Sequence, residues 1–237
     1  MKQQPLFLLF FLTPFLSFGQ TEARPHLYMM PGFGADSRVF SKLTIENADT
    51  VGLTYLVPEK SETLPQYARR MAQQIDTTRP FYILGVSFGG MVAVEMSKFL
   101  KPEQIIIVAS CKTTDEMPLR YRFQQKIPIY KWVSGRMMIR SAPIVAYFFE
   151  RDMRTNMAFF KTMIAAKNPD FMKRAFIQIM SWQNTSYPKN LIHLHGSKDH
   201  TLPIRYIKNA QTLAGAGHWA IYVNAEAISK VINEAIQ

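Results

Sequence analysis

The sequence predicts an α/β fold in which a mostly parallel sheet is flanked by helices and carries one helical insertion. Short, continuous apolar runs alternate with helical patterns near both ends of the chain. Strands covered on both faces in a parallel sheet typically form such runs, whereas half-exposed strands alternate apolar and polar residues. The alternation stops over residues 112–190, where no run is typical of a strand. We therefore expect one α/β domain with an insertion between two of its strands.

The first half of the chain supplies most of the expected sheet. Its expected strands, each dominated by apolar residues, cover residues 26–30, 51–57, 81–84 and 105–109. Its expected helices cover residues 37–43, 63–75 and 89–98. In the second of these helices, Leu64, Tyr67, Met71 and Ile75 fall on one face, which is typical of a helix packed on a core.

The alternation resumes after the insertion. Two helical patterns rich in methionine and aromatic residues lie within the insertion, at residues 144–149 and 171–182. After it, a strand is expected at residues 191–195, a short strand at 210–213 and a last helix at 225–236. The insertion also holds eight of the fourteen methionines, and these adaptable side chains suit the core of a lid, with contacts to a ligand from its inner face as the alternative.

Residues 1–19 have the outline of a secretory signal peptide. The segment has a lysine at position 2, is dominated by Leu and Phe, and ends in a pattern of small residues. Its apolar run is short for a membrane span, and an uncleaved anchor is the alternative. We expect an extracytoplasmic protein. The expected division of the chain is a signal peptide at 1–19, a core at 20–111 and 191–237, and a helical cap at 112–190.

Basic residues are in excess and are concentrated in the insertion. The formal net charge is +11 and the sequence pI is about 9.8, which is compatible with anionic substrates, an anionic membrane surface or nucleic acid. The chain has no zinc-finger spacing and no RNP-type segment, so nucleic acid is not an expected partner. Residues 112–190 hold 14 Lys and Arg against 5 Asp and Glu. This basic cap is expected either to favour anionic substrates and membrane surfaces or to be an ordinary solvated face.

The stretch 85–89 contains the candidate nucleophile, Ser87. It follows an apolar strand and precedes an apolar helix, with glycines two residues before and two residues after the serine. A serine on a sharp strand-to-helix turn presents its hydroxyl to an open cleft, and the folded-back backbone leaves no room for side chains at the flanking positions. The N-terminus of the following helix also favours negative charge beside this hydroxyl. The alternative is an idle serine in a glycine-rich turn.

Two further groups complete a candidate triad. A serine hydroxyl needs a base that takes its proton, and the base needs a group that fixes its tautomer. His218, in a glycine-rich loop before the last helix, is the candidate base. Asp199, in the loop after the strand at 191–195, is the candidate carboxylate. The order Ser87, Asp199, His218, with each residue after a strand, is the α/β-hydrolase order.

Together these motifs resemble an α/β-hydrolase-fold serine hydrolase of the carboxylesterase type with a helical cap. The resemblance covers nearly the whole chain after the signal peptide. It implies Ser87 as the nucleophile, His218 as general base and then general acid, and Asp199 as the orienting carboxylate. It implies neither a cofactor nor a metal ion.

The oxyanion loop and two other features depart from the family pattern. Residues 31–34 stand where the family has its oxyanion loop, so the implied oxyanion donors are the backbone N–H groups of Phe33 and Phe88. The family loop usually begins with His-Gly, whereas Pro31 takes the place of the histidine here. The antiparallel strands that usually precede the first parallel strand are not expected. The short interval between the acid and the histidine leaves little room for the usual helix there.

Other residues are alternatives for these roles. Asp115, shortly after a strand, is an alternative acid. His193 and His195 share a strand face, as two metal ligands would, but no third ligand is evident, so structural histidines are favoured. Cys111 is the only cysteine, which excludes an intramolecular disulfide and predicts a small buried residue. Epoxide hydrolases and dehalogenases carry aspartate at the elbow, where this chain has Ser87.

The expected function is hydrolysis of a small-molecule carboxylic ester, or a related acyl compound, through an acyl-enzyme. A cofactor-free lyase or acyltransferase that keeps the same triad is one alternative, because one fold supports many chemistries. A ligand-binding protein with a weakly active triad is another. Product analysis distinguishes the first alternative, and reactivity of the serine without turnover identifies the second.

Overall fold

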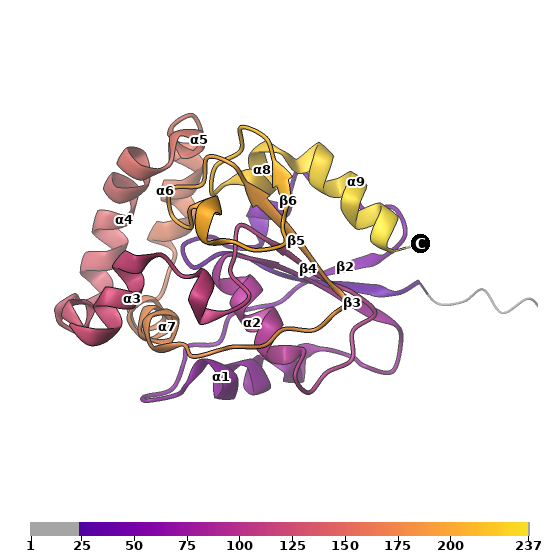
Figure 1. The fold of residues 1–237 in the computed structure, drawn as a ribbon, viewed down its shortest axis with the longest axis horizontal. Helices are drawn as coiled ribbons and strands as arrows, with labels where there is room; N and C mark the ends of the chain where they lie inside the picture. The colour runs from indigo at the N-terminus through magenta and orange to yellow at the C-terminus, as the bar shows by residue number, and fades with distance from the viewer. Residues whose placement is uncertain (1–23, 237) are drawn as a thin grey trace, which may run out of the picture.

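A six-stranded parallel sheet forms the centre of the structure (Figure 1). The computed structural model describes residues 24–236. The strands lie in the order β2-β1-β3-β4-β5-β6, and every neighbouring pair is parallel. Their bounds are β1 His26–Met30, β2 Asp49–Gly52, β3 Phe81–Val86, β4 Ile105–Val108, β5 Leu191–Gly196 and β6 Gln211–Leu213. The fold class predicted from the sequence is confirmed.

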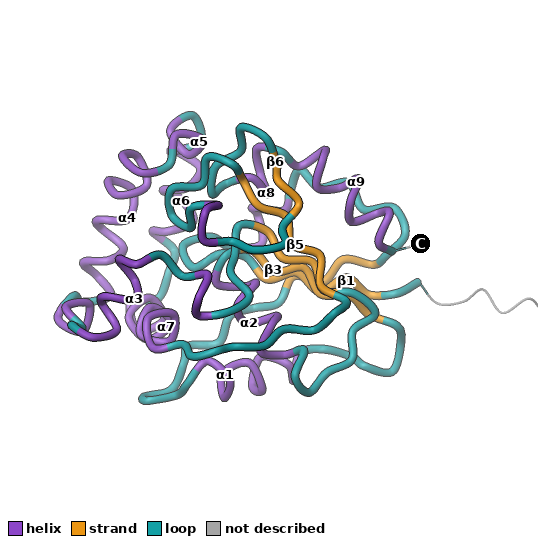
Figure 2. The backbone as a smooth tube through the Cα atoms, in the orientation of Figure 1, coloured by secondary structure: helices purple, strands orange, loops and turns teal. Residues whose placement is uncertain are grey.

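Helices cover both faces of this sheet (Figures 1 and 2). On one side lie α1 (Leu64–Met71) and α2 (Phe88–Met96), and on the other lie α8 (Ala220–Val223) and α9 (Ala225–Ala235). The central strands β3 and β4 are buried along their whole length. Both of their faces meet covering helices, which is why their residues form continuous apolar runs rather than an alternating pattern.

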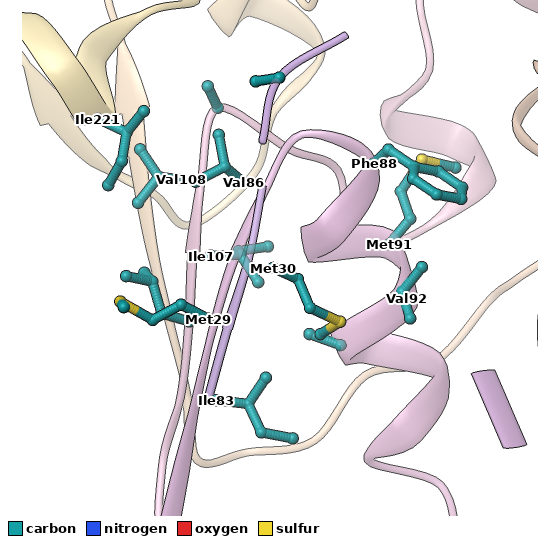
Figure 3. Packing of buried hydrophobic residues seen from close by; sticks show 14 of the residues in the cluster. Met29, Met30, Ile83, Val86, Phe88, Met91, Val92, Ile107, Val108 and Ile221 are labelled. Atoms are coloured by element: carbon teal, nitrogen blue, oxygen red, sulfur yellow. The ribbon is translucent and has the colours of Figure 1, made fainter. Parts of the chain in front are cut away.

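The core therefore has two layers, one on each face of the sheet (Figure 3). Met30 and Ile83 point toward Val92 of α2, whereas Met29 lies on the side of Ile221 in α8. Successive side chains of a strand point to opposite faces, so neighbouring Met29 and Met30 contribute to different layers. This packing fixes the position of α2 relative to the sheet and therefore the position of the turn that precedes α2.

The chain between β4 and β5, called the helical insertion below, contains helices and turns but no strand among the described residues. Its helices are α3 Leu119–Lys126, α4 Gly135–Phe149, α5 Arg151–Arg154, α6 Met157–Ala165 and α7 Pro169–Ser181. The helix α4 packs against α6 and α7, and α3 packs against α7. The insertion faces the residues that follow β1 and β3, so it lies over the C-terminal ends of these strands.

Several predicted elements have different bounds in the structure, and the helix expected at 37–43 is only a 3₁₀ turn, Ser37–Phe40. The strand expected at 51–57 is wrong, because β2 is Asp49–Gly52 and residues 53–57 are irregular. This edge strand pairs only with β1, whose partner residues end at Met29, and the chain then leaves the sheet. The helix expected at 63–75 is α1, which begins at a capping box of Thr63 and Gln66 and ends in a 3₁₀ turn.

The remaining expectations concern the two ends of the sheet. Every strand pairing within residues 24–236 is parallel, as expected from the sequence. Between β5 and β6 the structure has only the 3₁₀ turn Ile204–Tyr206, which agrees with the predicted lack of room for a helix.

The predicted signal peptide at 1–19 lies outside the described residues, so an extracytoplasmic location stays a prediction. No helix of residues 24–236 has both the length and the apolar character needed to cross a membrane.

A substitution of Gly89 tests how tightly α2 is seated. A Cβ at this position would lie 2.7 Å from the carbonyl oxygen of Pro31, which is backbone and has no rotamer to change. We expect Gly89→Ala to lower the free energy of unfolding by about 1–3 kcal/mol or more, as overpacked core sites do. Urea unfolding followed by circular dichroism measures this change. The control is Gly52→Ala, whose Cβ would meet only the Cβ of Ser37 at 3.3 Å, and equal losses in both variants would contradict the argument.

Candidate active site

Ser87 occupies the sharp turn between β3 and α2. Its φ of 52° lies in the left-handed region, which is rare for a residue with a side chain. A Cβ on Gly85 would lie 2.5 Å from the carbonyl oxygen of Gly89, so the predicted requirement for glycine on both sides of the serine is confirmed. The hydroxyl of Ser110 donates to the carbonyl oxygen of Ser87 at 2.7 Å and braces the turn. The strained turn aims the Ser87 side chain into the cavity described below.

The three candidate catalytic residues lie in one hydrogen-bonded line. Ser87 Oγ is 3.0 Å from His218 Nε2, and His218 Nδ1 is 2.8 Å from Asp199 Oδ2. Asp199 also accepts a hydrogen bond from the backbone N–H of Leu202 at 2.7 Å through Oδ1. A carboxylate at Nδ1 holds the proton there and leaves Nε2 free to accept the serine proton.

Two carboxylates of the helical insertion hold the histidine loop. Glu150, between α4 and α5, is buried, and its Oε2 accepts from the backbone N–H of His218 at 3.2 Å. Its Oε1 accepts from the backbone N–H of Thr201 at 2.6 Å, so one carboxylate joins the two loops that carry the acid and the base. Asp152 Oδ2 accepts from the backbone N–H of Trp219 at 3.0 Å.

These charges determine the protonation of the candidate base. Burial of the imidazole lowers the pKa of His218, but the carboxylates of Asp199, Glu150 and Asp152 together more than offset this, and the pKa is about 9. Burial raises the pKa of Asp199, but His218 and His195 more than offset this, and its pKa is held well below the usual range. Asp199 is therefore a carboxylate at any pH at which the histidine titrates.

Two backbone N–H groups flank the serine where an oxyanion would form. A Cβ on Gly32 would lie 3.4 Å from the Cβ of Ser87, so the loop after β1 runs directly beside the serine. Within residues 24–236, the N–H groups of Phe33 and Phe88 donate to no other protein group, and both residues line the cavity next to Ser87. Unpaired donors in such a position are able to stabilise negative charge on a substrate oxygen.

Pro31, in the loop after β1, accepts a hydrogen bond through its carbonyl oxygen. The hydroxyl of Tyr55 donates to the carbonyl oxygen of Pro31 at 2.6 Å. Burial raises the pKa of Tyr55 well above its usual value, so this residue acts only as a neutral donor. The hydrogen bond braces the loop from behind at the position where the family pattern has a histidine.

A cavity of about 480 Å³ opens above Ser87. Its lining is mostly apolar and comes from the sheet loops on one side and from the helical insertion on the other. Six methionines contribute to the wall: Met91, Met117, Met138, Met153, Met172 and Met180. Arg120 is the only Lys or Arg in this lining, and it donates to the carbonyl oxygen of His200 at 2.6 Å. The cavity therefore offers an adaptable apolar surface, with Ser87 and His218 among its few polar groups.

Comparison with known proteins supports this architecture. No family model matches the sequence, and no curated protein matches it. Among solved structures, an esterase (EaEST) from Exiguobacterium antarcticum superposes with a TM-score of 0.66 at 13% identity, over 91% of this chain and 92% of that chain. A hydrolase from Pseudomonas aeruginosa PA01 superposes with a TM-score of 0.67 at 13% identity, over 90% of each chain. A thermophilic esterase from Thermogutta terrifontis superposes with a TM-score of 0.60 at 16% identity, over 89% of this chain and 88% of that chain.

The chain has the α/β-hydrolase fold. Likeness at these identities extends to the architecture, and the chemistry has to be argued from the residues of the site.

Behind the acid, this α/β-hydrolase fold carries a buried chain of hydrogen bonds. Lys112 Nζ lies 2.9 Å from His193 Nδ1, and His193 Nε2 lies 3.2 Å from His195 Nδ1. His195 Nε2 lies 2.7 Å from the carbonyl oxygen of Leu202 and 3.3 Å from Asp199 Oδ2. An ammonium group only donates, so His193 must accept at Nδ1 and donate from Nε2, and His195 must do the same. The direction of the chain therefore places the N–H of His195 at Nε2, where it donates to the carbonyl oxygen of Leu202 and lies close to Asp199. Glu116 pairs with Lys112 at 2.8 Å and balances its buried charge.

The alternative assignments are not favoured by the structure. His218 contacts Asp199, whereas Asp115 is exposed on a 3₁₀ turn. His193 and His195 use their ring nitrogens within the chain just described, and no group of three His, Cys, Asp or Glu able to hold a metal occurs in the described part of the chain. Cys111 is buried, as predicted, and burial raises the pKa of its thiol.

Sequence reasoning missed several residues of the site. Glu150, Asp152 and Lys112 lie far along the chain from the groups they contact, so no local motif marks them. For Asp152, the glycine at position 217 was the one hint in the sequence that a side chain approaches the histidine loop closely. A Cβ on Gly217 would lie 2.6 Å from Asp152 Oδ2, so the glycine before the histidine makes room for a carboxylate.

The raised pKa of His218 predicts an alkaline pH profile. Only the neutral imidazole accepts the serine proton, so kcat/KM should rise with pH to a half-maximum near 9 and fall about tenfold for each unit below it. Initial rates on an uncharged ester from pH 6 to 10, corrected with the Ser87→Ala protein, measure this. Asp152→Asn keeps an acceptor for Trp219 but removes a charge, and should move the half-maximum to lower pH. A half-maximum near 6.5 in both proteins would contradict this account.

Two substitutions of Lys112 test the buried chain of hydrogen bonds. Both Lys112→Met and Lys112→Gln leave Glu116 buried without its cation. Breaking a buried ion pair lowers the free energy of unfolding by about 3–5 kcal/mol, so both variants should have a lower melting temperature. Gln retains an N–H donor for His193, whereas Met has none. We therefore expect a several-fold lower kcat for the Met variant than for the Gln variant, with similar KM values. Equal kcat values would show that the direction of the chain does not matter for turnover.

Proposed function

We propose that this protein is a serine hydrolase that cleaves carboxylic esters. The observation that carries the proposal is the unbroken line from Ser87 Oγ through His218 to the carboxylate of Asp199, at the base of an apolar cavity. The two unpaired N–H groups of Phe33 and Phe88 beside the serine add the second requirement of acyl transfer. A nucleophile, its base and donors for an oxyanion together support this reaction class.

The chemistry follows from these positions. Ser87 Oγ attacks the ester carbonyl carbon while His218 Nε2 takes the hydroxyl proton, and the carbonyl oxygen becomes an oxyanion at the N–H groups of Phe33 and Phe88. The imidazolium then returns the proton to the alkoxy oxygen as the C–O bond breaks, and an alcohol leaves an acyl-enzyme. Water attacks the acyl carbon with His218 again as base, the acid is released and the serine is restored. Asp199 remains ionised throughout.

The cavity supports an apolar substrate. Apolar and methionine side chains dominate the lining, and the one Lys or Arg there, Arg120, already donates to the loop that carries Asp199. The part of the substrate that enters the insertion side of the cavity is therefore an alkyl or aromatic group rather than a charged one. An anionic substrate would find only Arg120 and the imidazole of His218 as cationic contacts inside the cavity.

The solved structures support the proposal at the level of analogy. Several of the proteins with the same fold carry the name esterase, and one is described as an N-acyl homoserine lactone degrading enzyme. An acyltransferase would use the same acyl-enzyme with a different acceptor in place of water, and a lyase would give products without net addition of water. The products formed from an ester in buffered water distinguish these outcomes.

Removal of the nucleophile gives the decisive test. Ser87→Ala should lower hydrolysis of p-nitrophenyl butyrate by about 10⁴-fold or more and abolish labelling by a fluorophosphonate probe, because no other group is positioned to attack. Ser97→Ala, at the other end of α2, is the matched control and should retain activity and labelling. Activity that persists in the purified Ser87→Ala protein would refute the proposal. Labelling of the parent protein without turnover would instead favour a ligand-binding protein.

A further inference from the structure

The outer surface of the helical insertion is unusually apolar for a surface that faces water. Of the fourteen large apolar residues that are exposed in the described chain, eleven lie between residues 119 and 149. Trp132 is 84% exposed, Phe148 is 70% exposed and Ile144 is 61% exposed. Such a concentration of exposed apolar side chains marks an interaction surface rather than the scattered apolar residues of an ordinary surface.

The same stretch is strongly and uniformly basic. Residues 117–149 contain no Asp or Glu. Six cations in this stretch are exposed: Arg120, Arg122, Lys126, Lys131, Arg136 and Arg140. Apolar aromatic side chains interleaved with Lys and Arg are typical of segments that lie at the interface of a membrane, because the rings enter the acyl boundary while the cations contact lipid phosphates.

The helix α4 shows how this surface is related to the cavity. One face, with Met138 and Ala142, lines the cavity, whereas Ile144 and Phe148 on the other face do not. A helix that is apolar on both faces is normally buried on both. The outer face of α4 has no covering element among residues 24–236, and Figure 1 places α3 and α4 at the edge of the molecule opposite α9.

We propose that the surface formed by residues 119–149, here called the docking surface, binds the protein to an anionic lipid bilayer. Its cations match anionic headgroups, and its exposed rings match the apolar boundary below them. A second copy of the chain fits this surface less well. In a twofold dimer the same patch meets itself, so six cations would face six cations with no carboxylate between them.

The docking surface is continuous with the cavity. Val145 and Phe149 line the cavity and are also about half exposed, at 51% and 52%. An ester dissolved in the bilayer would therefore reach Ser87 along an apolar path without crossing water. This step rests on the proposed function, whereas the binding of the bilayer does not depend on any catalytic residue.

The chain contains its own reporter for the test. Of its three tryptophans, Trp182 and Trp219 are buried at 2% and 5% exposure, so Trp132 is the one whose emission responds to a change of surroundings. The protein, matured by the producing cells and with its N-terminus determined by intact mass, is mixed with vesicles of phosphatidylcholine with or without phosphatidylglycerol. We expect a blue shift and cosedimentation with the anionic vesicles, weakened by salt. Trp132→Phe should lose the shift and retain most of the cosedimentation.

Paired variants locate the binding on the docking surface. Arg136→Gln with Arg140→Gln should weaken partitioning by about fivefold for each cation removed. Ile144→Gln with Phe148→Gln should weaken it by about tenfold or more. Two double variants are the controls. Lys60→Gln with Lys101→Gln removes exposed cations elsewhere on the protein, and Val57→Gln with Val223→Gln removes exposed apolar residues elsewhere. Both controls should bind vesicles as the parent protein does. Hydrolysis of a water-soluble ester and the melting temperature should be unchanged in all four.

Three results would overturn the proposal. The first is that the protein does not bind anionic vesicles. The second is that the parent and both docking-surface variants bind equally well. The third is that the protein forms a stable dimer that the same substitutions abolish. The second result would place the membrane contact elsewhere in the chain. Failure of the proposed function is distinguishable, because Ser87→Ala should bind vesicles as the parent does even though it hydrolyses nothing.

Discussion

The charge of Asp199 is the constraint on which the site depends. Its side chain is completely buried, and a buried carboxylate is tolerated only when donors surround it. The backbone N–H of Leu202, the imidazole of His218 and the ring of His195 supply those donors from three parts of the chain. The loop after β5, the histidine loop and β5 itself are therefore held together by one charge, and the same charge makes His218 a stronger base.

The helical insertion is part of this electrostatic arrangement and not only a cover for the cavity. Glu150 binds backbone N–H groups of both the acid loop and the histidine loop, and Asp152 binds the residue after the histidine. Three carboxylates around one imidazole favour its protonated form. Movement of the α4–α5 junction would change both the position and the basicity of His218, so the cavity wall and the candidate base are physically coupled.

The parts of the site that the sequence predicts are those with a local cause. The glycines around Ser87 follow from a turn with no space for Cβ atoms, and the chain order of serine, acid and histidine follows from the parallel sheet. The roles of Lys112 and Glu150 could not be predicted, because the histidines they contact, His193 and His218, lie tens of residues away and only the fold brings them together. The wrong strand at 51–57 has a similar origin. Tyr55, one of its apolar residues, hydrogen-bonds to Pro31 in the loop after β1 and packs against Phe88, and it does not extend the sheet.

The distribution of charge then explains how a strongly basic chain can contain an acidic centre. Carboxylates concentrate around His218, where each accepts backbone N–H groups, whereas the exposed cations of residues 119–149 have no carboxylate within their own stretch. Like charges on one surface repel, and only a partner of opposite sign relieves the cost. The apolar side chains between them carry a second cost in water, which the same partner would remove if it were itself amphipathic. The charge repulsion and the exposure of apolar side chains to water occur on the same surface, beside the opening of the cavity. Contact with one partner that has a charged surface and an apolar interior would therefore reduce both.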